Sequence, residues 1–167
     1  EAGFPSSNPK EAELFELLAD QPLETAVVCA FGMTHRRGVA AEDDEALRVL
    51  VGSFAPVVTL VGKTWALHLE KVTRVTRAEN LAMIADSVGF CRAHGKRVVY
   101  DAEHFFDAWR DDREYALRCA TAAAEAGAEV VCLCDTNGAS LPPFVSEVVR
   151  EVVSALPDVV VGVHVHN

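Results

Sequence analysis

The chain has 167 residues, half of them apolar, and a formal net charge of −10. Its isoelectric point is near 5.0 and its mean hydropathy is +0.16, which fits one globular domain with a sizeable core. The excess of negative charge argues against nucleic acid and against an anionic membrane surface as partners. No apolar run reaches the roughly 18 residues that would indicate a membrane span.

Two features of the sequence favour a cytoplasmic protein. The chain does not open on the basic and apolar segments of a signal peptide. Its cysteines are odd in number and lie mostly in apolar runs, which is typical of small buried side chains in a reducing compartment. Two of them form a Cys-x-Cys string, but no second cysteine pair accompanies it, which counts against a zinc ribbon. The cysteines are Cys29, Cys91, Cys119, Cys132 and Cys134.

Segments with apolar residues at helical spacing alternate along the chain with short, continuous apolar runs. After a strand-like stub at residues 1–5, apolar residues at helical spacing predict helices over 10–19, about 45–52, about 77–94, 112–126 and 142–156. Continuous apolar runs predict strands over 25–31, 56–61, 97–100, 130–134 and 159–166. Pro22 breaks the first helix, and Gly95 and Gly127 end two later ones.

The alternation of elements indicates the class of fold. Short, continuous apolar strands separated by helices, with a repeat of about 30 residues, are typical of a parallel sheet with both faces covered. A doubly wound sheet and a (β/α)8 barrel both produce this pattern. No Gly-x-Gly-x-x-Gly string follows any of the strands, which counts against a dinucleotide site.

Chemically reactive side chains follow nearly every predicted strand at its carboxyl end. In a barrel these ends converge on one mouth, where the active site lies. Any single cluster could be an ordinary solvated loop. Five clusters, each at the carboxyl end of a predicted strand, favour a shared active site. In chain order they are Thr34-His35-Arg36, then Lys63, then Asp101, Glu103 and His104, then Asp135, Thr136 and Asn137, and finally His164 and His166.

The last strand ends in a His-x-His string. Alternate residues of a strand point to the same face, so His164 and His166 leave the sheet together. Two adjacent imidazoles at a strand end suit a divalent metal such as Zn, Mn, Fe or Co. The alternative is a pair of ordinary strand-end histidines.

Four strings of residues occur in an order that resembles a known family. They are Glu-x-Gly-Phe-Pro at 1–5, Tyr-Asp-Ala-Glu-His-Phe-Phe-Asp at 100–107, Cys-Asp-Thr-Asn-Gly at 134–138 and Gly-Val-His-Val-His-Asn at 162–167. Together they resemble the α-isopropylmalate, homocitrate and citramalate synthases, which are TIM barrels related to HMG-CoA lyase. The second string and Ala-Phe-Gly at 30–32 look most like the citramalate synthase branch.

The resemblance implies an α/β fold, a (β/α)8 TIM barrel, of which this chain covers roughly strands two to seven as a single catalytic-barrel fragment. It implies a metal-dependent acyltransferase that joins acetyl-CoA to a 2-oxo acid, with pyruvate as the expected substrate and citramalate as the product. A 2-isopropylmalate or homocitrate synthase, an HMG-CoA-lyase-like enzyme and a non-catalytic fragment are the alternatives. We expect the intact protein to be a homodimer. The fragment itself is expected to be inactive and, with unpaired strand edges, prone to associate.

The resemblance also implies roles for individual residues. His164 and His166 match the family's histidine ligands to a divalent metal (Mn, Mg, Zn or Co), whereas the family's aspartate ligand has no counterpart in this sequence. Glu103 matches the glutamate expected to take part in proton transfer, and Thr136 matches the threonine that contacts the oxo acid. The other expected site residues are His104 as a weaker catalytic candidate and, on the substrate side, Asp135 and Arg36.

Structural alternatives exist for most of these residues. Glu103 could be a loop carboxylate paired with Lys96 or Arg97, and Thr136 could be an ordinary turn hydroxyl. Arg36, beside Arg37, could attract CoA phosphates or lie solvated at the surface, and Lys63 is equally ambiguous. We expect three other histidines to be surface or helix-end residues, namely His35, His68 and His94.

Overall fold

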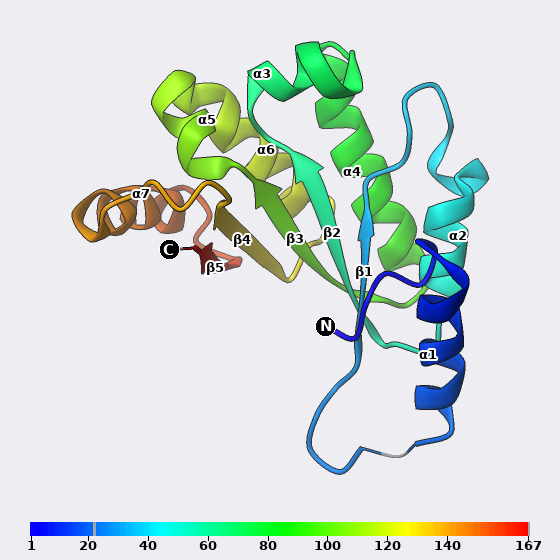
Figure 1. The fold of residues 1–167 in the computed structure, drawn as a ribbon. Helices are drawn as coiled ribbons and strands as arrows, with labels where there is room; N and C mark the ends of the chain where they lie inside the picture. The colour runs from blue at the N-terminus through cyan, green and yellow to red at the C-terminus, as the bar shows by residue number, and fades with distance from the viewer. Residues whose placement is uncertain (22, 167) are drawn as a thin grey trace.

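The computed structural model describes residues 1–21 and 23–166. Pro22, expected to break the first helix, and Asn167, the last residue of the His-x-His-Asn string, lie outside the described residues. Five parallel strands form one sheet in the order β1-β2-β3-β4-β5. The strands fan out from β1, beside the N-terminus, to β5, beside the C-terminus (Figure 1). Their bounds are β1 Cys29–Met33, β2 Val57–Lys63, β3 Arg97–Glu103, β4 Val130–Asp135 and β5 Val160–Val165.

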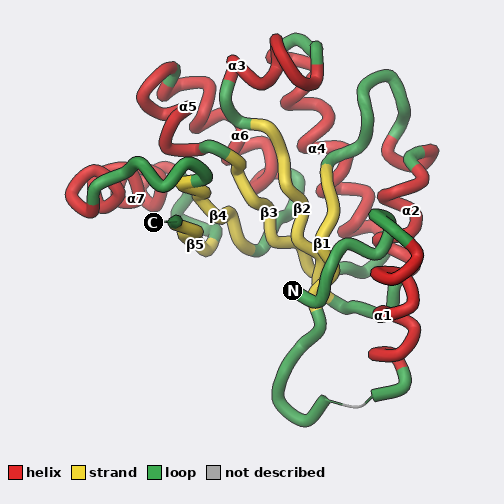
Figure 2. Tube along the Cα trace, in the orientation of Figure 1, coloured by secondary structure: helices red, strands yellow, loops and turns green. Residues whose placement is uncertain are grey.

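Helices connect the successive strands, as the tube in Figure 2 shows. The five predicted helices are present, and three short elements were missed, namely the 3-10 turn Ala41–Asp43, the turn formed by α3 with the π-helical segment after it, and α5. No helix in the described part of the chain has both the length and the apolar character needed to cross a membrane. The bounds are α1 Pro9–Ala19, α2 Glu45–Gly52, α3 Ala66–His68, the π-helical turn Leu69–Thr73, α4 Arg77–Ala93, α5 Phe105–Asp111, α6 Arg113–Glu125 and α7 Pro142–Ala155.

Side chains at the N-termini explain where several helices begin. The Asn8 carboxamide oxygen accepts hydrogen bonds from the first turn of α1, and the Asp112 carboxylate accepts one from the first turn of α6. Thr76 and Glu79 form a reciprocal capping box at the start of α4. Each satisfies backbone N–H groups that have no partner within the helix. The helices therefore begin at polar residues close to the sequence expectation.

The two faces of the sheet have different surroundings. The strands pair in register, so every second side chain points to the same face. The outer face packs against α2, α4, α6 and α7, and its fully buried residues include Val58, Leu60, Tyr100, Val131 and Leu133. The inner face carries Met33, Val61, Asp101, Cys132 and His164 and faces no helix of the described chain.

Helices cover only the outer face of the described sheet, which fits the barrel expected from the sequence rather than a doubly wound sheet. In a closed barrel, inward-facing side chains pack against other strands rather than against helices. This explains why the strands read as continuous apolar runs although only one face meets helices. An open parallel sheet with helices on one face is what one part of such a barrel would present.

The strand boundaries differ from the sequence expectation at the start of β1 and at the ends of β2 and β3. Residues 25–28 are not strand, because β2 begins at Val57, opposite Cys29, and offers them no partner. The stub at residues 1–5 does pair: Gly3 bridges Ala30 in parallel, at the free edge of β1. β2 and β3 run on together to the pair Lys63 and Glu103, further than predicted. The longer ladder sets these two polar side chains side by side.

Candidate active site at the carboxyl ends of the strands

Lys63 and Glu103 form an ion pair at the ends of β2 and β3. The Lys63 ammonium contacts Glu103 Oε2, and the two side chains are only 15% and 24% exposed. The alternative partners considered for Glu103 are wrong, because both lie at the far end of β3. Arg97 Nε binds Glu129 at 2.8 Å, and Lys96 Nζ donates to the carbonyls of Ser53 and Ala55.

His68, expected at the surface or at a helix end, is the last residue of α3 and lies beside this ion pair. Helix α3 brings its Nδ1 to 4.0 Å from Glu103 Oε2, and its ring meets the His104 ring edge-on at 4.6 Å between centroids. Trp65 packs against both rings. Burial, with the nearby His104 and Lys63, lowers the pKa of His68, so the imidazole is favoured in its neutral form.

His104 links the end of β3 to the loop after β4. Its backbone is left-handed, with φ of 54°, a conformation that a non-glycine residue holds only when its surroundings enforce it. Its N–H donates to Thr136 Oγ1 at 2.9 Å, and its Nδ1 lies 3.0 Å from Asp107 Oδ2. Asn137 Nδ2 donates to the same Asp107 oxygen at 3.0 Å. Glu103, His104 and Thr136 thus converge as the sequence reading expected.

Asp135 is buried at the end of β4, with 1% of its surface exposed. Its Oδ2 accepts the N–H of Ser140 at 2.9 Å, which closes the turn after the strand. Its Oδ1 is buried and has no hydrogen-bond partner among the described residues. A buried acceptor without a partner is costly, so Asp135 has capacity for one further donor.

Arg36 lies on the loop after β1 and is tied to Asp44. Its backbone N–H and Nε both donate to Asp44 Oδ2, at 3.0 and 3.1 Å, while Asp44 Oδ1 caps α2 through Ala46 and Leu47. Burial of Asp44 opposes its ionisation. The hydrogen bonds from Arg36 and Leu47 and the guanidinium charge outweigh that cost and lower the pKa of Asp44. His35, expected at the surface or at a helix end, is instead buried on the loop after β1, and its N–H donates to Ser87 on α4.

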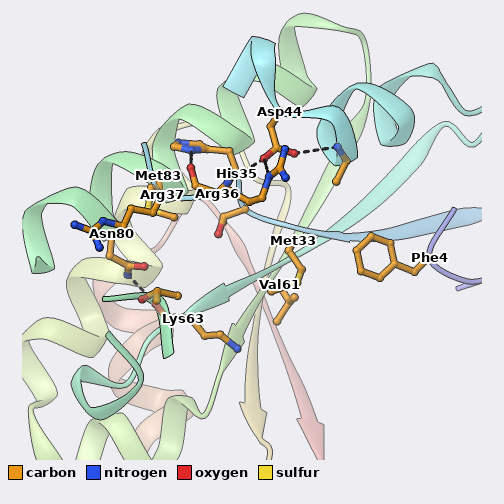
Figure 3. A pocket seen from close by; sticks show the side chains of 13 residues that line it. Phe4, Met33, His35, Arg36, Arg37, Asp44, Val61, Lys63, Asn80 and Met83 are labelled. Atoms are coloured by element: carbon orange, nitrogen blue, oxygen red, sulfur yellow. Dashed lines mark hydrogen bonds and ion pairs between the residues drawn. The ribbon is translucent and has the colours of Figure 1, made fainter. Parts of the chain in front are cut away.

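A cleft of about 340 Å³ opens between this loop and the strand ends. Arg36 and Lys63 are among its lining residues, and the paired strand residues Met33 and Val61 lie between Phe4 and Lys63 (Figure 3). The cleft therefore has an apolar floor and a cationic rim. Through Lys63 it adjoins the carboxylate of Glu103.

His164 and His166 lie at the exposed end of β5, with ring centroids 4.8 Å apart. Cys134 on β4 pairs with His164, and the register of β3 with β4 places Glu103 one strand further along the same inner face. Two exposed imidazoles on one face are a donor set that suits a divalent metal.

One compact group of three potential metal ligands occurs in the described residues, and neither histidine of the His-x-His string belongs to it. It consists of Asp101, Cys132 and Cys134. A hydrogen bond to Cys132, together with burial, raises the pKa of the Cys134 thiol, and burial raises the pKa of Asp101. Metals bind thiolates and carboxylates rather than their protonated forms, so an ion bound by this group would have to displace protons.

The geometry defines the class of protein: a partial parallel α/β barrel with reactive side chains gathered at the carboxyl ends of its strands. An HMGL-like family model matches residues 1–167, and the chain belongs to that family. The hydroxymethylglutaryl-CoA lyase of Pseudomonas aeruginosa superposes with a TM-score of 0.75 at 16% identity, covering 99% of this chain and 54% of that chain. At that identity the likeness shows the fold.

Relatives with higher sequence identity show which members of the family this chain resembles most. The (R)-citramalate synthase of Sulfolobus acidocaldarius is 43% identical over 167 residues, which is 100% of this chain and 32% of that protein. A probable 2-isopropylmalate synthase of Methanopyrus kandleri is 34% identical over the same length, 31% of that protein. The expected family, and the greater similarity to citramalate synthases, are confirmed. The chain spans about a third of the length of these relatives.

Proposed function

We propose that the protein containing this chain is a metal-dependent acyltransferase that joins acetyl-CoA to pyruvate and releases citramalate and CoA. The observation that carries the proposal is the placement of Glu103. Its carboxylate is held at the strand ends by Lys63, next to the hydrogen-bonded pair His104 and Thr136, and on the same inner face as His164. The 43% identity to a citramalate synthase supports it.

The chemistry assigns Glu103 the proton-transfer step. Its carboxylate accepts a proton from the methyl carbon of acetyl-CoA, and the electron pair left on carbon forms the bond to the ketone carbon of pyruvate. The ketone oxygen takes up a proton and becomes the hydroxyl group. Water then cleaves the thioester, which leaves a new carboxylate and the free thiol of CoA.

The remaining site residues have binding roles in this proposal. The Thr136 hydroxyl accepts the His104 N–H, so its own proton is free to hydrogen-bond the oxo acid carboxylate. Arg36 lies on the rim of the cleft, where its charge favours the phosphates of CoA. His104, held by Asp107, is placed to pass on a proton, and Asp135 shapes the adjoining turn through Ser140.

The two histidines fit a divalent metal, since both residues are exposed and their ring centroids lie 4.8 Å apart at the end of β5. His164 and His166 would hold Mn, Mg, Zn or Co. When bound, such an ion would hold the oxo acid and polarise its ketone. We propose further that the intact protein is a cytoplasmic homodimer, and that the 167-residue chain by itself is inactive, since its described residues offer these two histidines no compact third ligand.

The test is the release of CoA thiol by the intact protein with acetyl-CoA, Mn or Mg, and one 2-oxo acid at a time. We expect release with pyruvate and little with 2-oxoisovalerate or 2-oxoglutarate. Release with 2-oxoisovalerate alone would favour a 2-isopropylmalate synthase, the activity named for the 34% identical relative. No release with any of the three would contradict the proposal.

A further inference from the structure

The sequence left the role of Lys63 open, and the structure determines its position closely. It is the last residue of β2, directly opposite Glu103 in the ladder. Asn80 on α4 donates to the Lys63 carbonyl at 2.8 Å and to Tyr115 at 2.9 Å. Asn80 is buried, with 1% of its surface exposed, so α4 fixes the backbone from which the lysine side chain extends.

Lys63 and His68 approach the same oxygen of Glu103. The ammonium and the His68 imidazole both lie against Oε2. Within residues 1–21 and 23–166 no hydrogen bond reaches the other oxygen, Oε1. One oxygen of the carboxylate is therefore held by the protein, while the second is left for a substrate.

From this arrangement we infer that Lys63 is a positioning residue for Glu103: it holds Oε2 and thereby aims Oε1 at the proton to be removed. The inference rests on the proposed condensation reaction. A partly buried ion pair suits this task, because a carboxylate without its cation at 24% exposure would turn toward water. Holding a reacting group in one orientation is a large part of catalysis.

His68 adds a second neighbour to the same oxygen, with its Nδ1 at 4.0 Å from Glu103 Oε2. Its ring packs against both Trp65 and His104, and these two rings also contact each other. Other charged groups are further removed or engaged, since Asp107 binds His104 and Arg36 binds Asp44. Lys63 is thus the cation that orients Glu103 among the described residues.

The test uses the intact protein and the thiol-release assay with pyruvate. We expect Lys63→Met to lower kcat by about 100-fold, as misplacement of a reacting group does, and to leave KM for pyruvate nearly unchanged. Lys63→Arg keeps the charge and should recover part of the loss. The matched control is Lys71→Met, which removes the charge of an exposed lysine in the neighbouring turn and should retain wild-type kcat.

A double-mutant cycle with Glu103→Gln decides whether Lys63 acts through Glu103. If it does, Lys63→Met/Glu103→Gln will be no slower than Glu103→Gln alone. The inference would be overturned if the fold-losses in kcat of the two single variants multiplied in the double variant, or if a folded Lys63→Met variant kept wild-type kcat. The proposed function would stand in either case. A wild-type protein inactive with every 2-oxo acid would overturn both. If Lys63→Met does not fold, Lys63→Arg in the same cycle gives the same decision.

Discussion

At the scale of single residues, sequence motifs identified some members of the candidate site, and the tertiary structure added others. Glu103, His104 and Thr136 were predicted together from their motif strings and do lie together. His68 and Asp107 were not predicted as part of the site. Their side chains reach it through α3 and α5, two short elements whose amphipathic stripes are too brief to recognise in the sequence.

Asp44 provides a prediction about a single residue. Its carboxylate caps α2 and binds Arg36, so Asp44→Ala should lower the free energy of unfolding by about 2 kcal/mol. Because the pKa of Asp44 is lowered in the folded protein, this contribution is present above its unfolded pKa and is lost as the pH falls through the folded value. Urea unfolding of the intact wild-type and Asp44→Ala proteins at pH 7 and at pH 3 measures the loss of stability and its pH dependence.

The matched control for Asp44 is Asp43→Ala, which removes an exposed carboxylate from the adjacent turn. It should change stability by less than about 0.5 kcal/mol. Equal effects of the two substitutions, or an Asp44 effect that does not shrink in acid, would contradict the role given to this cap.

At the scale of elements, the register of β2 with β3 is what assembles the site. Gly62 allows the close approach, because a Cβ there would collide with the ring and hydroxyl of Tyr100, which is fully buried. Gly62→Ala should therefore cost about 1–3 kcal/mol of stability. It should also lower activity, since the next residue is Lys63. Thermal unfolding and thiol release of the intact protein test the two effects.

Two controls separate overcrowding from a general effect of replacing glycine. Tyr100→Phe removes the phenol oxygen nearest to the added methyl group and should restore part of the stability of Gly62→Ala. Gly89→Ala lies within α4, where nothing meets the new Cβ, and should be neutral or stabilising by up to about 1 kcal/mol. A Gly62→Ala protein as stable as wild type would disprove the crowding.

At the scale of the whole molecule, the described sheet has an open inner face and a strand paired on one side only. Three valines of β5 are half exposed or more, Val160 at 64%, Val163 at 51% and Val165 at 54%. Unpaired strand edges with apolar side chains favour association. We expect the isolated 167-residue chain to sediment as oligomers or aggregates, and a monodisperse monomer with a sharp melting transition would contradict this.

The sequence by itself determined the alternation of strands and helices, the parallel sheet and the His-x-His string, because periodicity and motif strings are local properties. It did not determine which charges meet. Glu103 pairs with Lys63 rather than with Lys96 or Arg97, because the β2–β3 ladder aligns residues 40 positions apart. Tertiary structure likewise decided that helices cover only one face of the sheet. A buried strand has the same apolar sequence whether it packs against helices or against the other strands of a closed barrel.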